Sequence, residues 1–172
     1  MASLAGEWPT RAEVVRLFGE PVGNLGPAPR RARGLRYIPE QRLGHGAVPE
    51  LSLLDNVVLT GDALHRRGVV QRDDARRYTD GVIRAFNVRT EGVEARAASL
   101  SGGNLQRFIV GRETQAGPRV LVVDQPTWGV DVGAAVAIRN ALIALRARGC
   151  AIVVISKFQP PQPADRGHTK DR

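Results

Sequence analysis

The chain has 172 residues, of which 42% are hydrophobic and 24% charged, which is typical of a globular protein with room for one buried core. No apolar run approaches the roughly 20 residues of a membrane-spanning helix, so the composition excludes an integral membrane protein of that type. A single cysteine, Cys150, excludes an internal disulfide and is typical of a reducing cytoplasm.

The net charge is +8, from 25 Lys and Arg residues against 17 Asp and Glu residues. Such a charge can indicate binding to nucleic acid or to anionic lipid. All but two of the cations are arginines, however, and they are scattered without the interleaved aromatic residues that stack on bases. We therefore interpret the charge as a feature of composition and expect no nucleic-acid partner.

The first third of the chain predicts short elements. Residues 13–23 alternate weakly and end in turn residues, which favours a short strand and a turn. Residues 35–38 predict a strand that Pro39 ends. Residues 51–59 predict a short helix, which Ser52 can cap with Asp55 as its capping-box partner.

The middle of the chain predicts two longer helices. In residues 73–86 the apolar side chains recur on one helix face, at Ala75, Tyr78, Val82 and Phe86. Another helix should begin near Gly103, with an apolar side made by Leu105, Phe108 and Ile109. Both periods of apolar residues indicate helices that pack on a core.

The last third predicts a strand–helix–strand unit. Residues 119–123 form a continuous apolar run, typical of a parallel strand that is buried on both faces. A helix at 134–148, ended by Gly149, and a second buried strand at 151–155 follow. This βαβ order predicts an α/β fold. Residues 158–172 lack an apolar period and predict a disordered tail.

The stretch Ser101-Gly102-Gly103 has the chemistry of a phosphate contact. Two glycines let backbone N–H groups approach an oxyanion, and the helix that follows adds its positive end. By itself the stretch is better explained as a flexible loop or a plain helix cap. Its context favours the phosphate, because Asp124 ends the buried strand further on and a carboxylate at that position can bind Mg²⁺ beside a nucleotide.

Taken together, these motifs resemble the ATP-binding-cassette (ABC) ATPases of bacterial importers. The likeness is carried, in order, by "GLRYIPEQRLGHGAVPELSLLDNVVL", "LSGGNLQR", "VLVVDQPTWGVDVGA" and "AIVVIS", and it covers about residues 4–156. It is closest to the second cassette of the double-cassette subunits that serve simple-sugar and nucleoside uptake. The resemblance implies a P-loop NTPase-type parallel sheet in residues 1–157, with a helical subdomain insert at about 47–98.

The resemblance implies a nucleotide-binding role for five of these residues. Ser101, Gly102, Gly103 and Asn104 correspond to the signature motif, which in this family contacts the γ-phosphate of ATP bound to the opposite cassette. Asp131 corresponds to the loop that crosses the dimer interface, and its alternative role is a helix cap. ATP and Mg²⁺ are the implied cofactors.

Four further positions have an implied role: three correspond to family residues that hold the metal or take part in catalysis, and Glu40 is a sixth nucleotide-binding residue. Asp124 corresponds to the carboxylate that holds Mg²⁺ through water, and Gln125 stands in place of the catalytic glutamate. Glu40 stands where most cassettes have a glutamine that senses Mg²⁺ and the membrane partner, and Lys157 stands in place of the switch histidine. An amide at Gln125 removes the usual general base, a role worth about 10²–10⁴ in rate.

The chain departs from the family at its phosphate loop. The motif G-x-x-x-x-G-K-[ST] is absent, because the two lysines follow Ser156 and Thr169. We expect that the sequence starts after that loop and that a proline-rich tail replaces the final elements, so that the cassette is incomplete. The isolated chain is accordingly expected to hydrolyse no ATP.

The function implied by the resemblance is that of an ATP-binding subunit of an importer for simple sugars or nucleosides. Its partners would be a second ABC cassette and, through the helical subdomain, the membrane permease subunits, which places it peripherally on the cytoplasmic face of the bacterial inner membrane. One alternative is a non-enzymatic gene fragment with at most a binding role. Another is a DNA-repair or ribosome-associated ABC ATPase, against which "IPE-R" and "PTWGVDVGA" argue.

Overall fold

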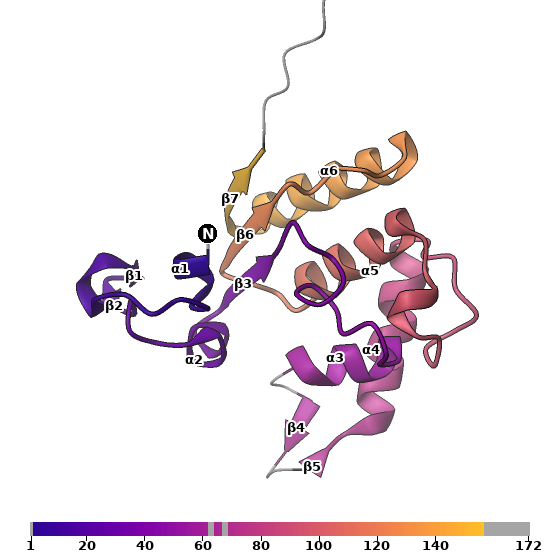
Figure 1. Cartoon of the computed structure of the whole chain (residues 1–172), viewed down its shortest axis with the longest axis horizontal. Helices are drawn as coiled ribbons and strands as arrows, with labels where there is room; N and C mark the ends of the chain where they lie inside the picture. The colour runs from indigo at the N-terminus through magenta and orange to yellow at the C-terminus, as the bar shows by residue number, and fades with distance from the viewer. Residues whose placement is uncertain (1, 62–63, 67–68, 157–172) are drawn as a thin grey trace, which may run out of the picture.

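The computed structural model describes residues 2–61, 64–66 and 69–156; Lys157 and the predicted tail at 158–172 lie outside them. Its centre is a parallel sheet of three strands in the order β3-β6-β7 (Figure 1). These strands are β3 (Leu35–Ile38), β6 (Val120–Asp124) and β7 (Ala151–Ile155). Nowhere in the described ranges does a helix combine the length and apolarity that crossing a membrane would demand.

The N-terminal elements lie at one end of the molecule (Figure 1). They are α1 (Ala2–Ala5), the 3₁₀ turn η1 (Ala12–Val14), β1 (Arg16–Leu17), β2 (Glu20–Pro21) and α2 (Pro27–Ala32). The strand predicted in this region is a two-strand hairpin, because Phe18 and Gly19 both have positive φ and close a two-residue turn between paired strands. Arg30 is fully buried and donates hydrogen bonds to the carbonyls of Leu4 (2.8 Å) and Gly23 (2.9 Å), which ties α2 to both neighbouring segments.

The middle of the chain forms α3 (Leu53–Thr60), β4 (His65–Arg66), β5 (Val69–Val70), α4 (Arg72–Ala85) and the 3₁₀ turn η3 (Ala97–Ser99). The predicted cap of α3 is confirmed: the Ser52 hydroxyl accepts a hydrogen bond from the backbone N–H of Asp55 at 2.9 Å and donates to its carboxylate at 2.7 Å. The helix predicted at 73–86 is also confirmed, one residue earlier at both ends.

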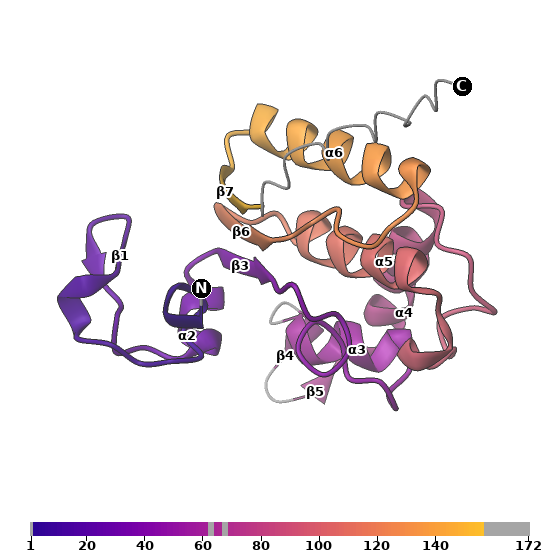
Figure 2. The same ribbon diagram turned by 45° about the horizontal axis from the view of Figure 1, so that its top comes forward.

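The remaining helices are α5 (Gly102–Gln115) and α6 (Val132–Ala147), each of which begins directly after a capping residue. Figure 2 shows α6, α5 and α4 one below another, and α5 contacts both of the others. One face of the sheet packs on these helices through residues such as Leu121 and Val123. The opposite face packs on the β1–β2 hairpin through Leu35 and Val122, as the alternation of side chains along a strand requires.

The expectation that both strands of the βαβ unit are buried is wrong for β7. The side chains of Leu121, Val122 and Val123 in β6 are buried, whereas Val153 and Val154 in β7 are 44% and 50% exposed. The physical reason is the strand order, because β6 lies between two strands and β7 is at the edge of the described sheet. The apolar composition of β7 alone did not distinguish a central strand from an edge strand.

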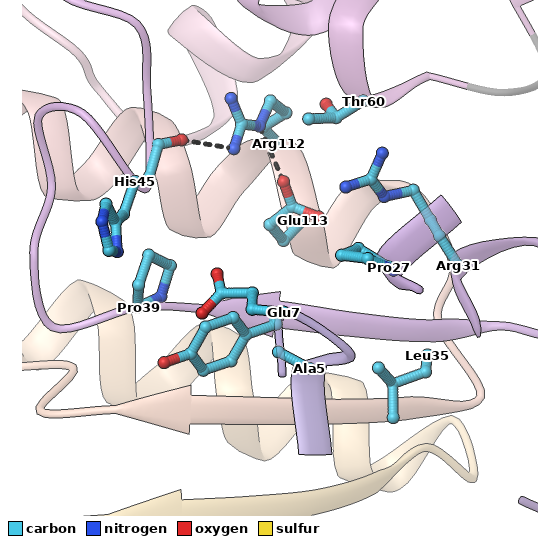
Figure 3. Close-up of a pocket in the computed structure, with 12 residues that line it drawn as sticks. Ala5, Glu7, Pro27, Arg31, Leu35, Pro39, His45, Thr60, Arg112 and Glu113 are labelled. Carbon is cyan, nitrogen blue, oxygen red and sulfur yellow. Dashed lines mark hydrogen bonds and ion pairs between the residues drawn. The ribbon is translucent and has the colours of Figure 1, made fainter. Parts of the chain in front are cut away.

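The second half of α5 carries buried charges beside a small cavity of about 100 Å³ (Figure 3). Arg112 donates from Nε to the Glu113 carboxylate at 2.7 Å and from a terminal nitrogen to the Gly46 carbonyl, also at 2.7 Å. Arg36 on β3 lies 3.7 Å from the other oxygen of the same carboxylate. These contacts join the sheet, the loop before α3 and α5.

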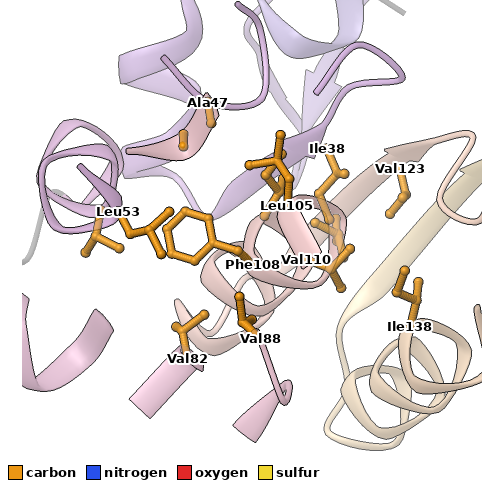
Figure 4. Packing of buried hydrophobic residues seen from close by; sticks show 14 of the residues in the cluster. Ile38, Ala47, Leu53, Val82, Val88, Leu105, Phe108, Val110, Val123 and Ile138 are labelled. Carbon is orange, nitrogen blue, oxygen red and sulfur yellow. The ribbon is translucent and has the colours of Figure 1, made fainter. Parts of the chain in front are cut away.

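The main hydrophobic core surrounds Phe108 of α5 (Figure 4). This ring is fully buried and packs in one cluster with Leu53 of α3, Val82 of α4 and Ile38 of β3. Ile138 brings α6 into the same cluster. Burying each such side chain stabilises the fold by about 1.5–3 kcal/mol. The core therefore fixes α5 in the centre of the molecule and places its first turn at the surface.

Candidate functional site

The first turn of α5 contains the motif residues Ser101 to Asn104. Ser101 is the N-cap: its hydroxyl accepts hydrogen bonds from the backbone N–H of Asn104 at 3.4 Å and from the Asn104 side-chain nitrogen at 3.0 Å. The Asn104 side-chain oxygen in turn accepts from the backbone N–H of Arg89 at 3.0 Å. The amides of Gly102 and Gly103 are in the first helical turn, where backbone N–H groups lack an intrahelical acceptor. They are available to an anion.

Asp131 is the N-cap of α6. Its carboxylate accepts a hydrogen bond from the backbone N–H of Ala134 at 2.8 Å and lies 3.5 Å from the guanidinium of Arg107. The pKa of Asp131 is held below its usual value, mainly because of the Ala134 hydrogen bond and to a lesser extent because of the Arg107 charge. Asp131 is therefore negatively charged at neutral pH.

The two helix starts meet at a surface hollow of about 240 Å³, lined by Arg89, Ser101, Asn104, Arg107 and Asp131. The glycines of the motif permit this approach. A Cβ atom on Gly103 would lie 3.0 Å from the Asp131 carboxylate, and one on Gly102 would lie 2.9 Å from a guanidinium nitrogen of Arg42. These surroundings suit a phosphate group, because they combine helix amides, two arginines and two glycines that leave room for close approach.

A second group of the predicted site residues lies where the parallel strands end. Asp124 is the last residue of β6 and is half-buried, and Glu40 follows β3 at the same edge of the sheet. Gln125 is buried, with a positive φ of 49° and a backbone hydrogen bond of 2.8 Å to the carbonyl of Ile155. Its side-chain nitrogen is buried without a hydrogen-bond partner. A buried amide here can donate a hydrogen bond but cannot take a proton from water.

The edge of the sheet has a negative electrostatic environment. The pKa of Tyr37 is raised to about 12, first by burial and then by the charges of Asp124, Glu7 and Glu40. Within residues 2–61, 64–66 and 69–156, no three His, Cys, Asp or Glu side chains are grouped so that they could hold a metal ion. A single carboxylate such as Asp124 can bind Mg²⁺ only where nucleotide phosphates and water supply most of the other ligands.

The structure thus brings the sequence-predicted residues together in two places. Ser101 to Asn104 meet Asp131 at the hollow, and Asp124, Gln125 and Glu40 lie at the sheet edge, while Lys157 is outside the described residues. Sequence reasoning missed three polar residues near the hollow, namely Arg42, Gln106 and Arg107. The signal for two of them was present, because Gln106 and Arg107 directly follow the motif in "LSGGNLQR".

The fold is that of an ATP-binding cassette, as the motifs predicted. An ATP-binding subunit of an ABC transporter superposes with a TM-score of 0.68 at 22% identity, over 89% of this chain and 60% of that one. A dimeric ATP-binding cassette in a post-hydrolysis state, bound to ADP and phosphate, gives a TM-score of 0.67 at 21% identity, over 83% of this chain and 61% of that one.

Sequence comparison relates the chain more narrowly to the ATP-binding proteins of sugar importers. It is 38% identical over 154 residues to a ribose import ATP-binding protein of Rubrobacter xylanophilus, over 88% of this chain and 31% of the relative. It is 35% identical over 164 residues to a xylose import ATP-binding protein of Burkholderia ambifaria, over 93% and 31%. The chain therefore spans about a third of the length of these curated relatives. No protein-family model matches it.

Proposed function

We propose that this chain is an ATP-binding component of an importer for simple sugars and that it contributes the hollow at the start of α5 to ATP held by a second cassette. The hollow is the observation that carries the proposal, since Arg89 and Arg107 line it beside the start of α5, and Asp131 offsets the charge of only one of them. The ribose and xylose import ATP-binding proteins among its relatives support a simple sugar as the imported solute, and the dimeric cassette bound to ADP and phosphate supports the paired arrangement.

The two groups of residues would have separate tasks in this arrangement. Ser101 and the amides of Gly102 and Gly103 would bind the terminal phosphate of ATP, with Asp131 fixing the facing loop. Asp124 would hold Mg²⁺ through water at the sheet edge, where the ion neutralises phosphate charge. Gln125 would leave this edge without a general base. Because the sequence has no G-x-x-x-x-G-K-[ST] motif, the loop that cradles the phosphates would come from the second cassette.

The partners follow from the same proposal. The segment at about 47–98, which contains α3 and α4, would form the helical subdomain that contacts the permease subunits. Such an assembly places the chain peripherally on the cytoplasmic face of the bacterial membrane. Nucleic acid is not a proposed partner, since no aromatic residues interleave the arginines.

The test is ATP-dependent association with a complete cassette of a sugar importer, measured by light interferometry with the chain immobilised. Ser101→Arg should weaken association at least about 100-fold, because the long cation fills the space of the phosphate, a loss that equals about 2.7 kcal/mol. Ser99→Arg is the matched control: Ser99 is also exposed but does not line the hollow, so its association should equal that of the parent.

Two results would contradict the proposal. One is a parent chain that binds the cassette equally with and without ATP. The other is a Ser101→Arg variant that associates as well as the parent, in which case the motif is only a helix cap. Circular dichroism of both variants checks that they are folded.

A further inference from the structure

Arg42, in the loop after β3, contacts two other segments with one guanidinium. Its Nε donates to the side-chain oxygen of Gln106 at 3.1 Å. One terminal nitrogen donates to the Trp128 carbonyl, and the other lies 3.5 Å from the Gly129 carbonyl. The loop after β3, the start of α5 and the loop between β6 and α6 are therefore connected through a single side chain.

Gln106 extends this connection. It is 1% exposed, accepts the hydrogen bond of Arg42 and donates from its own nitrogen to the Pro126 carbonyl at 3.1 Å. Three carbonyl groups of the loop, at Pro126, Trp128 and Gly129, are thus approached by donors from Arg42 or from Gln106. A guanidinium suits this task because its donors have a fixed planar arrangement, whereas a lysine ammonium is a single point with rotatable donors.

The loop held in this way connects the two groups of site residues. It begins at Gln125 at the sheet edge and ends at Asp131 in the hollow. The same guanidinium also lies against the first turn of α5, where a Cβ on Gly102 would be 2.9 Å from its terminal nitrogen. The hydrogen-bond partners of Arg42 described above are neutral oxygens, so their common effect is geometric rather than the neutralisation of a charge.

We propose that Arg42 is a positioning residue of the hollow: together with Gln106 it fixes the loop 125–131 against the first turn of α5 and so sets the place of Asp131 relative to Ser101. This inference rests on the proposed function for its consequence, the binding of phosphate. It adds a residue and a role that the signature motif does not contain.

The experiment uses Trp128 as a reporter inside the loop. The chain has two tryptophans, Trp8 and Trp128, so Trp8→Phe leaves Trp128 as the only one. In this background, Arg42→Lys and Arg42→Gln should each raise the amplitude of fast local motion of Trp128 about twofold, as measured by time-resolved fluorescence anisotropy. Lysine should restore little of the loop's rigidity, because it keeps the positive charge but lacks the fixed planar arrangement of donors. Arg139→Lys and Arg139→Gln, at an exposed arginine on α6, are matched controls and should change nothing.

The same variants are then compared in the ATP-dependent association assay, where Arg42→Lys should weaken association about tenfold. Unchanged anisotropy in both Arg42 variants would show that Arg42 does not hold the loop. A larger amplitude of fast Trp128 motion combined with parental association would show that holding the loop does not serve the hollow. A parent that fails to associate contradicts the proposed function alone, and the anisotropy of the isolated chain then decides whether Arg42 positions the loop.

Discussion

The two ends of α5 use charged residues in opposite ways. At the C-terminal half, the Arg112 and Glu113 side chains are only 6% and 4% exposed, and their charges are paired inside the protein. At the N-terminal end, the Asp131 side chain that faces the helix is 65% exposed, and Arg107 lies beside it at the edge of an open hollow. The first arrangement satisfies its donors within the fold, and the second leaves helix amides free for a ligand. The residue types alone do not distinguish a structural ion pair from a candidate binding site; the difference is whether the hydrogen-bonding partners are already present within the fold.

The largest expected effect is at the buried end. Glu113→Ala leaves the guanidinium of Arg112 buried without its carboxylate and removes the neighbour of Arg36, so the free energy of unfolding should fall by about 3–5 kcal/mol. Glu94→Ala is the control, because Glu94 pairs with Arg76 at the surface, where such a pair contributes at most about 1 kcal/mol. Urea unfolding followed by circular dichroism measures both. Equal losses of unfolding free energy in the two variants would mean that the buried ion pair stabilises the fold no more than the surface pair does.

An intermediate effect is expected at Gly111, directly before Arg112, where α5 meets α4 through packing rather than polar contacts. A Cβ on Gly111 would lie 2.7 Å from the ring of Phe86 and 2.9 Å from Val82, so Gly111→Ala should cost about 1–3 kcal/mol through overpacking of α4 on α5. Gly81 in α4 has space, with its nearest neighbour at 3.8 Å, and Gly81→Ala should stabilise by about 1 kcal/mol through helix propensity. Thermal unfolding should give a lower melting temperature than the parent for Gly111→Ala and a higher one for Gly81→Ala. A higher melting temperature for Gly111→Ala would refute the contrast.

The smallest effect is expected at the exposed end, through pH. Because the pKa of Asp131 is lowered in the folded chain, its stabilising contribution is present above the pKa of the unfolded chain, about 3.9, and is lost as pH falls through the lower folded value. Asp131→Asn keeps a capping oxygen but cannot titrate. The difference in stability between parent and variant should therefore shrink between pH 5 and pH 2, as measured by unfolding at a series of pH values. A constant difference would show that Asp131 is not linked to folding in this way.

These three measurements sharpen the comparison along one helix. We expect a large loss of unfolding free energy only at Glu113, a steric effect at Gly111 and a weak, pH-dependent effect at Asp131. Such a result would show that stability is concentrated at the buried end. The exposed end then keeps its polar groups for binding, which is the division that the proposed function requires.

Local features of the sequence predicted much of the fold and several residues of the candidate site. The order of the main helices and strands follows from periodicity, and Ser52 and Ser101 cap α3 and α5, because a cap depends only on the three residues that follow it. The hairpin around Phe18 and Gly19 was predicted as one short strand followed by a turn at its end, since a turn with a phenylalanine at positive φ has no strong local signal.

The sequence by itself determined the helix caps, the apolar strands and the motif that places glycines at the first turn of α5. Only the tertiary structure decided that β7 is an exposed edge, that Glu113 is paired inside the core, and that Arg42 reaches the loop before α6. The physical reason is distance along the chain. A cap or an apolar period is a property of neighbouring residues, whereas burial and the partners of Arg42, which lie more than 60 positions further on, depend on which segments fold side by side.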